Sequence, residues 1–119
     1  MWNWYFGWIA ILAAFVSGTL LGLFFFREDF LGGYASFRRR MLRLGHVALA
    51  ALGMINVLYA LAPGADASRL AELGFLTGGV TMPLVCFLSA WRPGMRHLFF
   101  IPVTCLIVAA VQTLRVGLP

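Results

Sequence analysis

The chain has 119 residues, of which 62% are hydrophobic and 11% are charged. A soluble globular domain has charges on about a quarter of its residues, so this chain lacks the polar side chains needed to cover a water-soluble core. Composition therefore predicts a single integral membrane domain over residues 1–119. The net charge of +5 comes from nine arginines, which gather between apolar segments instead of along one extended surface. That distribution argues against a nucleic-acid partner.

Four apolar segments contain no Asp, Glu, Lys or Arg. Each is ~17–23 residues long, enough to cross a hydrocarbon core ~30 Å thick. The sequence therefore predicts an all-α fold, a four-helix transmembrane bundle with helices at about 4–26, 44–62, 73–91 and 98–114.

The arginines predict the orientation of this bundle. Five of them lie between the first and second segments, whereas Arg69 alone lies between the second and third. Arg92 and Arg96 lie between the third and fourth. Because cytoplasmic connections carry the excess of basic residues, we expect the first and third connections inside and both termini outside. The expected location is the inner membrane of a bacterium.

The basic connection at 30–43 interleaves aromatic side chains with arginines. We expect it to lie along the inner membrane surface, with its arginines on anionic lipid headgroups. Docking on the acidic face of a partner subunit is the alternative. The arginines that would make these contacts are Arg38, Arg39, Arg40 and Arg43.

Small residues recur every four positions along the first segment, at Ala10, Ala14, Gly18 and Gly22. Such a stripe lets another helix approach closely, so it predicts a packing interface within the bundle or with a partner protein. In the third segment, Pro83 removes the hydrogen bond that the Gly79 carbonyl would accept, which predicts a kink there. Cys86 and Cys105 both lie in apolar segments and are interpreted as packing residues.

Two histidines, His46 and His97, are expected at similar depth near the inner face. Facing imidazoles at matched depth can ligate a b-type haem, which is one interpretation of the pair. The competing interpretation is that both are interfacial polar residues without a cofactor.

A second polar group is expected in the outer half of the bundle. It comprises Asn56, Gln112, Thr77 and Thr81. Amides in lipid seek partners, so an Asn56–Gln112 or Asn56–threonine hydrogen bond would pin the helices together. A quinone carbonyl could use the same groups.

The run Gly74–Thr81 is similar to the Gly/Thr-rich broken third helix of small fluoride channels, which also have four helices. This resemblance implies a small ion channel. It covers eight positions, and Met82-Pro83-Leu84 replaces the Phe/Ser/Thr continuation of that family. Small multidrug transporters have a glutamate within the first helix, and no acidic residue lies in any of these segments.

No Ser-His-Asp, HExxH, paired-carboxylate or phosphate-loop pattern occurs in the sequence. We therefore expect a non-catalytic accessory subunit of a larger membrane complex. Small apolar subunits of respiratory and photosynthetic electron-transfer complexes provide the analogy. The alternatives are a haem- or quinone-binding electron-transfer protein and a small channel or carrier.

Overall fold

The structure is a computed structural model, and it describes residues 1–117. Within these residues it is all-helical and has no strand. The long helices are α1 (Trp2–Phe24), α2 (Phe37–Leu61), α3 (Arg69–Trp91) and α4 (Phe100–Val116), and the short 3-10 helices are η1 (Phe30–Gly32), η2 (Ala65–Ala67) and η3 (Pro93–Phe99). Four helical stretches, the fourth being η3 and α4 together, are long and apolar enough to cross a membrane. The prediction of an all-helical fold with four helices long and apolar enough to span a membrane is thus confirmed.

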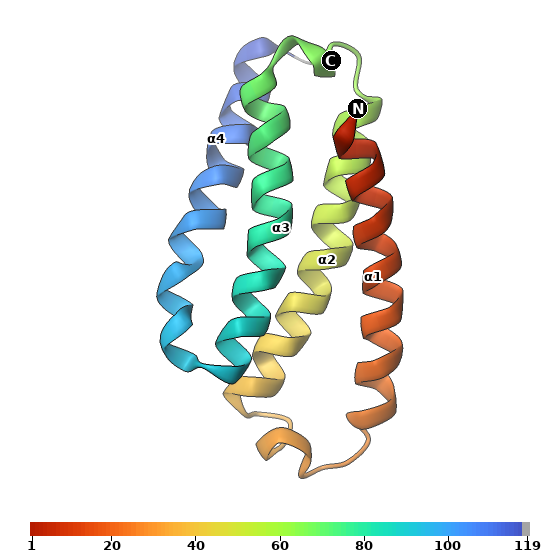
Figure 1. Cartoon of the computed structure of the whole chain (residues 1–119), viewed down its shortest axis with the longest axis vertical. Helices are drawn as coiled ribbons and strands as arrows, with labels where there is room; N and C mark the ends of the chain where they lie inside the picture. The colour runs from red at the N-terminus through yellow and green to blue at the C-terminus, as the bar shows by residue number, and fades with distance from the viewer. Residues whose placement is uncertain (118–119) are drawn as a thin grey trace.

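The helices pack in chain order, each antiparallel to the one before it (Figure 1). α2 packs between α1 and α3, whereas α4 packs mainly on α3 and η3. The Cα trace measures 49 × 27 × 18 Å. α4 consequently forms one edge of the molecule, where only Pro102 and Ala109 are buried. α1 begins and α4 ends at the same end of the molecule (Figure 1).

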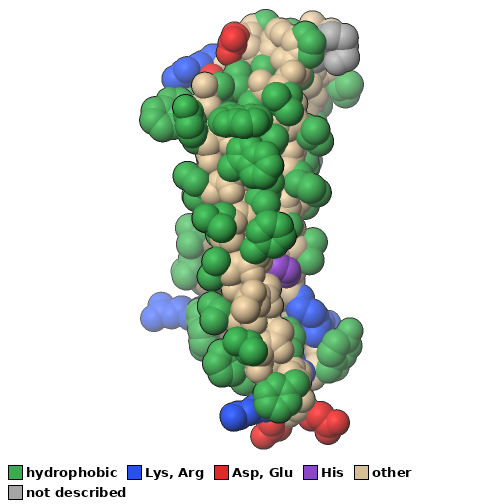
Figure 2. Space-filling model, turned by 90° about the vertical axis from the view of Figure 1, so that its right-hand side faces the viewer, with side chains coloured by type: hydrophobic (Ala, Val, Ile, Leu, Met, Phe, Trp, Pro, Cys, Tyr) green, Lys and Arg blue, Asp and Glu red, His purple; other side chains and the backbone are tan. Residues whose placement is uncertain are grey.

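The outer surface carries the exposed hydrophobic side chains that contact with lipid requires. Hydrophobic side chains cover the middle of the face seen in Figure 2, and charged side chains lie toward its two ends. Large apolar side chains such as Leu12, Phe15 and Ile107 are more than half exposed. In water this surface would drive aggregation, whereas hydrocarbon solvates it without cost.

The second and third helices begin earlier than the apolar segments suggested, and the reason is capping. Ser36 Oγ accepts a hydrogen bond from the Arg39 amide at 3.2 Å, so α2 begins at Phe37. Ser68 Oγ accepts from the Ala71 amide, also at 3.2 Å, so α3 begins at Arg69. Capping serines satisfy amides that would otherwise lack partners. The charge-free segments of the sequence therefore mark the apolar middle of each helix, and they do not show where the helix begins.

Close helix approach depends on glycine. A methyl group added at Gly7 of α1 would lie 2.7 Å from the Gly53 carbonyl oxygen of α2. One added at Gly74 of α3 would lie 3.0 Å from the Cys105 carbonyl oxygen of α4. Small residues therefore bring the backbones of neighbouring helices together, as is common between helices in lipid. α3 continues as a single helix through Pro83, which is buried.

Candidate functional site

A buried amide pair joins three helices at the end of the molecule where α1 begins. Asn3 Nδ2 donates to Asn56 Oδ1 at 2.8 Å and to the Glu72 carbonyl at 3.2 Å. Asn56 Nδ2 donates to the carbonyls of Leu52 at 2.8 Å and Phe75 at 3.2 Å. Both asparagine side chains are fully buried. Their amides thus fix α1, α2 and α3 relative to one another in surroundings that offer no water.

The structure does not assemble the polar group expected around Asn56. Its amide is occupied by Asn3 and by backbone carbonyls. Gln112 lies on α4, and within residues 1–117 its side chain makes no hydrogen bond with the protein. Thr81 Oγ1 donates at 2.7 Å to the carbonyl of Thr77, one turn earlier in the same helix. The Thr81 hydroxyl therefore bonds within α3, and among the described residues neither threonine hydroxyl bonds to Asn56.

Asn3 is the residue that sequence reasoning missed. It lies among tryptophans in the first turn of α1, where a polar side chain is unremarkable. The available signal was its position: Asn3 and Asn56 lie toward the same end of two neighbouring antiparallel helices. A lone amide in each of two neighbouring helices at matched depth indicates a pair.

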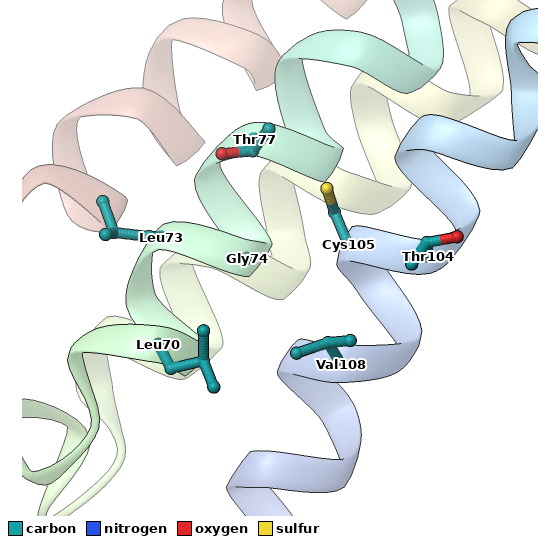
Figure 3. Close-up of a pocket in the computed structure, with 7 residues that line it drawn as sticks. All are labelled: Leu70, Leu73, Gly74, Thr77, Thr104, Cys105 and Val108. Atoms are coloured by element: carbon teal, nitrogen blue, oxygen red, sulfur yellow. The ribbon is translucent and has the colours of Figure 1, made fainter.

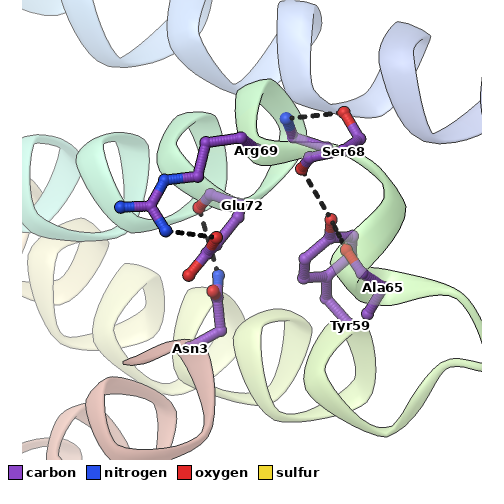
Figure 4. Close-up of polar contacts among 7 residues, drawn as sticks. Asn3, Tyr59, Ala65, Ser68, Arg69 and Glu72 are labelled. Carbon is purple, nitrogen blue, oxygen red and sulfur yellow. Dashed lines mark hydrogen bonds and ion pairs between the residues drawn. The ribbon is translucent and has the colours of Figure 1, made fainter. Parts of the chain in front are cut away.

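The loop that connects α2 and α3 lies at the same end of the molecule, where several polar contacts hold it (Figure 4). The Tyr59 hydroxyl donates to the Ala65 carbonyl at 2.8 Å and lies 3.3 Å from the Ser68 carbonyl. Arg69 Nη1 lies 3.3 Å from Glu72 Oε2, which is the one side-chain ion pair among the described residues. Phe75 packs against Tyr59 at 5.1 Å between ring centroids. These contacts order the loop between α2 and α3.

The basic residues at the opposite end fall into two classes. Arg39 is 2% exposed and donates to the carbonyls of Phe25 and Arg27, in the segment that follows α1. Arg43 lies 4.2 Å from the Tyr34 ring centroid and donates to the Tyr34 carbonyl at 3.0 Å.

Arg38 and Arg40 are exposed instead. The four arginines were expected to lie in a surface loop, whereas they lie in the first two turns of α2. Only Arg38 and Arg40 are free to meet a lipid headgroup or a partner protein without rearrangement.

The four small residues of the α1 stripe also differ in whether they make contacts inside the bundle. Ala10 and Ala14 are each 3% exposed, so they are buried within the bundle. A methyl group added at Gly18 would lie 2.7 Å from His46 Cε1 of α2. Gly22 has open space around it. Three of the four positions are therefore occupied by contacts inside this chain.

His46 lies on the α1–α2 interface, where its Nδ1 is 3.0 Å from Ser17 Oγ. Ser17 Oγ also lies 3.1 Å from the Ala14 carbonyl of its own helix. Which of Ser17 and His46 donates in their contact depends on the tautomer of the imidazole.

His97 lies elsewhere. It is exposed in η3, which packs on α3 and α4. The two histidines are thus on different helix interfaces, and the structure does not bring them together to hold a haem between them. No group of three or more His, Cys, Asp or Glu side chains able to hold a metal ion occurs within residues 1–117.

Apolar grooves follow two of the helix interfaces. The α1–α2 interface has one groove of about 220 Å³ and another of about 340 Å³. The first is lined by Ile11, Ala14, Phe15, His46, Ala50 and Met54, and the second by Trp8, Ile11, Met54, Val57 and Leu58. Ile11 and Met54 line both.

The α3–α4 groove has a volume of about 250 Å³ (Figure 3). Leu70, Leu73 and Val108 contribute to its apolar lining, and Thr77 and Thr104 stand at its sides. The Thr104 hydroxyl donates to the Phe100 carbonyl of its own helix at 2.6 Å. The Thr104 hydroxyl is therefore engaged within α4, and Thr77 and Cys105 are the other polar side chains of this lining.

No family model, curated protein or solved structure matches this chain.

Proposed function

We propose that this protein is a small non-catalytic accessory subunit of a larger membrane complex, of the electron-transfer type, in a bacterial inner membrane. The observation that supports it is the open edge formed by α4. This helix packs mainly on α3 and η3 and presents the exposed side chains of Ile107 and Val111. A helix held along one side only is an accessible surface for a second transmembrane protein.

The charge distribution supports an orientation for this subunit. We place both termini outside and the Arg38–Arg40 turn of α2 on the cytoplasmic side, because basic residues concentrate at cytoplasmic ends. Arg38 and Arg40 are exposed there and are available to anionic lipid headgroups or to an acidic partner surface. We also propose that α3 bends at Pro83, since the Gly79 carbonyl lacks its usual helical donor.

Crosslinking in native membranes tests the proposed subunit role. A photoreactive amino acid is placed at Ile107 on α4, which is 57% exposed, and a matched one at Val47 on α2, which is 56% exposed. The expected result is a discrete crosslinked partner from position 107 and diffuse lipid adducts from position 47. The same partner should co-purify with the chain in mild detergent.

Absence of a discrete adduct at position 107, together with a chain that migrates alone on native gels, would contradict the proposed role. Equal adducts from both positions would also contradict it, because they would show only lipid around both helices.

A further inference from the structure

Charged and aromatic side chains line a pocket at the end of the molecule where α1 begins. Its volume is about 450 Å³, within the range of ~300–1,000 Å³ that is usual for small-molecule sites. The first turn of α1, the η2 turn and the first turn of α3 all contribute to it. The lining residues are Met1, Trp2, Tyr5, Asp66, Arg69 and Glu72.

The charges of this lining favour a cation. It carries two carboxylates, Asp66 and Glu72, and one guanidinium, that of Arg69. Arg69 is paired with Glu72 on the first turn of α3 (Figure 4). Asp66 is exposed and has no ion-pair partner among residues 1–117, and no ion pair joins Met1 to either carboxylate. A cation in this pocket therefore gains the attraction of a carboxylate that no ion pair neutralises.

Glu72 gives the pocket a second acceptor. The residue is 9% exposed, and its ion pair with Arg69 uses Oε2. Its Oε1 accepts none of the hydrogen bonds observed within residues 1–117. A carboxylate this far from water is stabilised by every charge that approaches it. Because the Arg69 side chain is 75% exposed, its pairing compensates Glu72 only in part, and a bound cation would add to it.

Two aromatic rings indicate the kind of cation. Trp2 and Tyr5 are three positions apart, so they lie on the same side of α1, and both are more than half exposed. A metal ion needs several protein ligands together, and no group of three or more His, Cys, Asp or Glu occurs within the described residues. The faces of aromatic rings instead attract quaternary ammonium groups, whose methyl groups pack on them.

We infer that this pocket binds a quaternary ammonium group of the choline type, with its methyl groups on Trp2 and Tyr5 and its charge beside Asp66 and Glu72. A free solute and a lipid headgroup both carry this group. Such a binding site goes beyond the proposed subunit role. It is tested on the purified chain alone, so its failure would leave the crosslinking result unaffected.

The test is a ¹⁹F NMR titration of the full chain, labelled with 5-fluorotryptophan, in dodecyl maltoside, a detergent without an ammonium group. Choline chloride is the probe, at constant ionic strength. The chain has four tryptophans, and Trp2→Phe assigns the Trp2 resonance. The expected result is a saturable shift of this resonance, while that of Trp91, at the opposite end of α3, stays unchanged.

Two analogues examine the charge and the methyl groups of the probe. 3,3-Dimethylbutan-1-ol has the shape of choline with carbon in place of nitrogen. Ethanolamine keeps the charge, but its ammonium is strongly hydrated and the rings cannot replace that water. Each should bind about tenfold more weakly than choline, which corresponds to ~1.4 kcal/mol. A cation–π contact and an exposed charge pair are together of this size.

Matched substitutions examine the lining. Tyr5→Leu removes one ring and Asp66→Asn removes one charge, and each should weaken choline binding at least threefold. Both positions are exposed, and retained far-UV circular dichroism shows that each variant folds. Tyr34→Leu and Asp29→Asn make the same changes at exposed positions in the connection between α1 and α2, at the opposite end of the molecule, and should leave the affinity unchanged.

Glycerophosphocholine identifies the source of the ammonium group. It carries the phosphodiester of a lipid headgroup, which Arg69 can bind as an anion. Tighter binding than that of free choline, with the difference lost in Arg69→Gln, would identify a lipid headgroup. Equal or weaker binding would identify a free solute.

Three results would overturn the inference. The first is a Trp2 shift that does not saturate or that Trp91 shares, which indicates a general effect of the salt on the micelle. The second is equal affinity for choline and for either analogue, since the charge or the methyl groups would then play no part. The third is unchanged affinity in both Tyr5→Leu and Asp66→Asn, which would place the ammonium group outside this pocket.

Discussion

The guanidinium carbon of Arg39 lies 4.6 Å from the centroid of the Phe25 ring, and its Nη2 donates to the Phe25 carbonyl at 3.1 Å. Phe25 is the C-cap residue that directly follows α1. The last carbonyls of a helix lack intrahelical donors, and the helix dipole favours a cation beside them. Arg39 of α2 thus closes the C-terminus of α1, with no carboxylate paired to it among residues 1–117.

Arg39→Met should therefore destabilise the protein. It removes hydrogen bonds to two carbonyls of the segment that follows α1 and a cation–π contact, and the expected loss is about 2 kcal/mol. Arg39→Lys should restore part of it, since an ammonium keeps the charge but not the planar fork. The free energy of unfolding is measured by titrating mixed micelles with SDS and following far-UV circular dichroism.

Arg38→Met is the matched control, because Arg38 is exposed one position away. Its effect should stay within about 0.5 kcal/mol. Similar losses from Arg38→Met and Arg39→Met would mean that net charge, and not the contact with α1, stabilises this end of the molecule.

The buried amide pair should show measurable coupling. Asn3→Ala and Asn56→Ala each remove one side of the 2.8 Å hydrogen bond, and a double-mutant cycle isolates the energy of the pair. Hydrogen bonds between helices in lipid contribute about 1 kcal/mol, which is the expected coupling energy. It is measured by the same SDS titration on the two single variants and the double variant.

Gln112→Ala provides the comparison for this cycle, since Gln112 lies on α4 away from Asn56. Combined with Asn56→Ala, it should show additive effects. Coupling between residues 56 and 112 with none between 3 and 56 would contradict the observed network and favour the pairing expected from sequence.

The sequence predicted the helices well because the solvent dictates them. Backbone groups in lipid must be satisfied within the segment, so apolar length alone predicts a helix. The side-chain contacts between helices were harder to predict, because they depend on which side of each helix faces its neighbour. Three consecutive arginines, residues 38–40, look equivalent in the sequence, and only the path of the α1–α2 connection selects Arg39 for burial. Asn56 was expected to need a partner, but the choice of Asn3 over Gln112 follows from the order of packing.

The glycines of the α1 stripe should respond in opposite directions to alanine. Gly18→Ala places a methyl group 2.7 Å from His46 Cε1, so it should destabilise the protein by about 1–3 kcal/mol. Gly22→Ala meets nothing within 4 Å and should stabilise it by about 0.5–1 kcal/mol through helix propensity. Thermal unfolding in a fixed detergent reports both.

The test is the difference in stability change between Gly18→Ala and Gly22→Ala. Destabilisation by Gly22→Ala in native membranes, with no effect in detergent, would mean that a partner protein occupies that position. Stabilisation by both substitutions would contradict the close contact between α1 and His46.

Cysteine labelling in intact cells tests the proposed orientation. In a chain with Cys86→Ala and Cys105→Ala, single cysteines are introduced by Asp66→Cys and Arg40→Cys at exposed positions near opposite ends of the molecule. A membrane-impermeant maleimide should label position 66 in spheroplasts and position 40 only after lysis, because the arginine-rich end is expected to face the cytoplasm. Each site removes one charge, and four other arginines remain between the first two spans after Arg40→Cys, so the charge bias persists. The reverse pattern would place the Arg38–Arg40 turn outside and invert the subunit, and labelling of both positions in intact spheroplasts would show a mixed population.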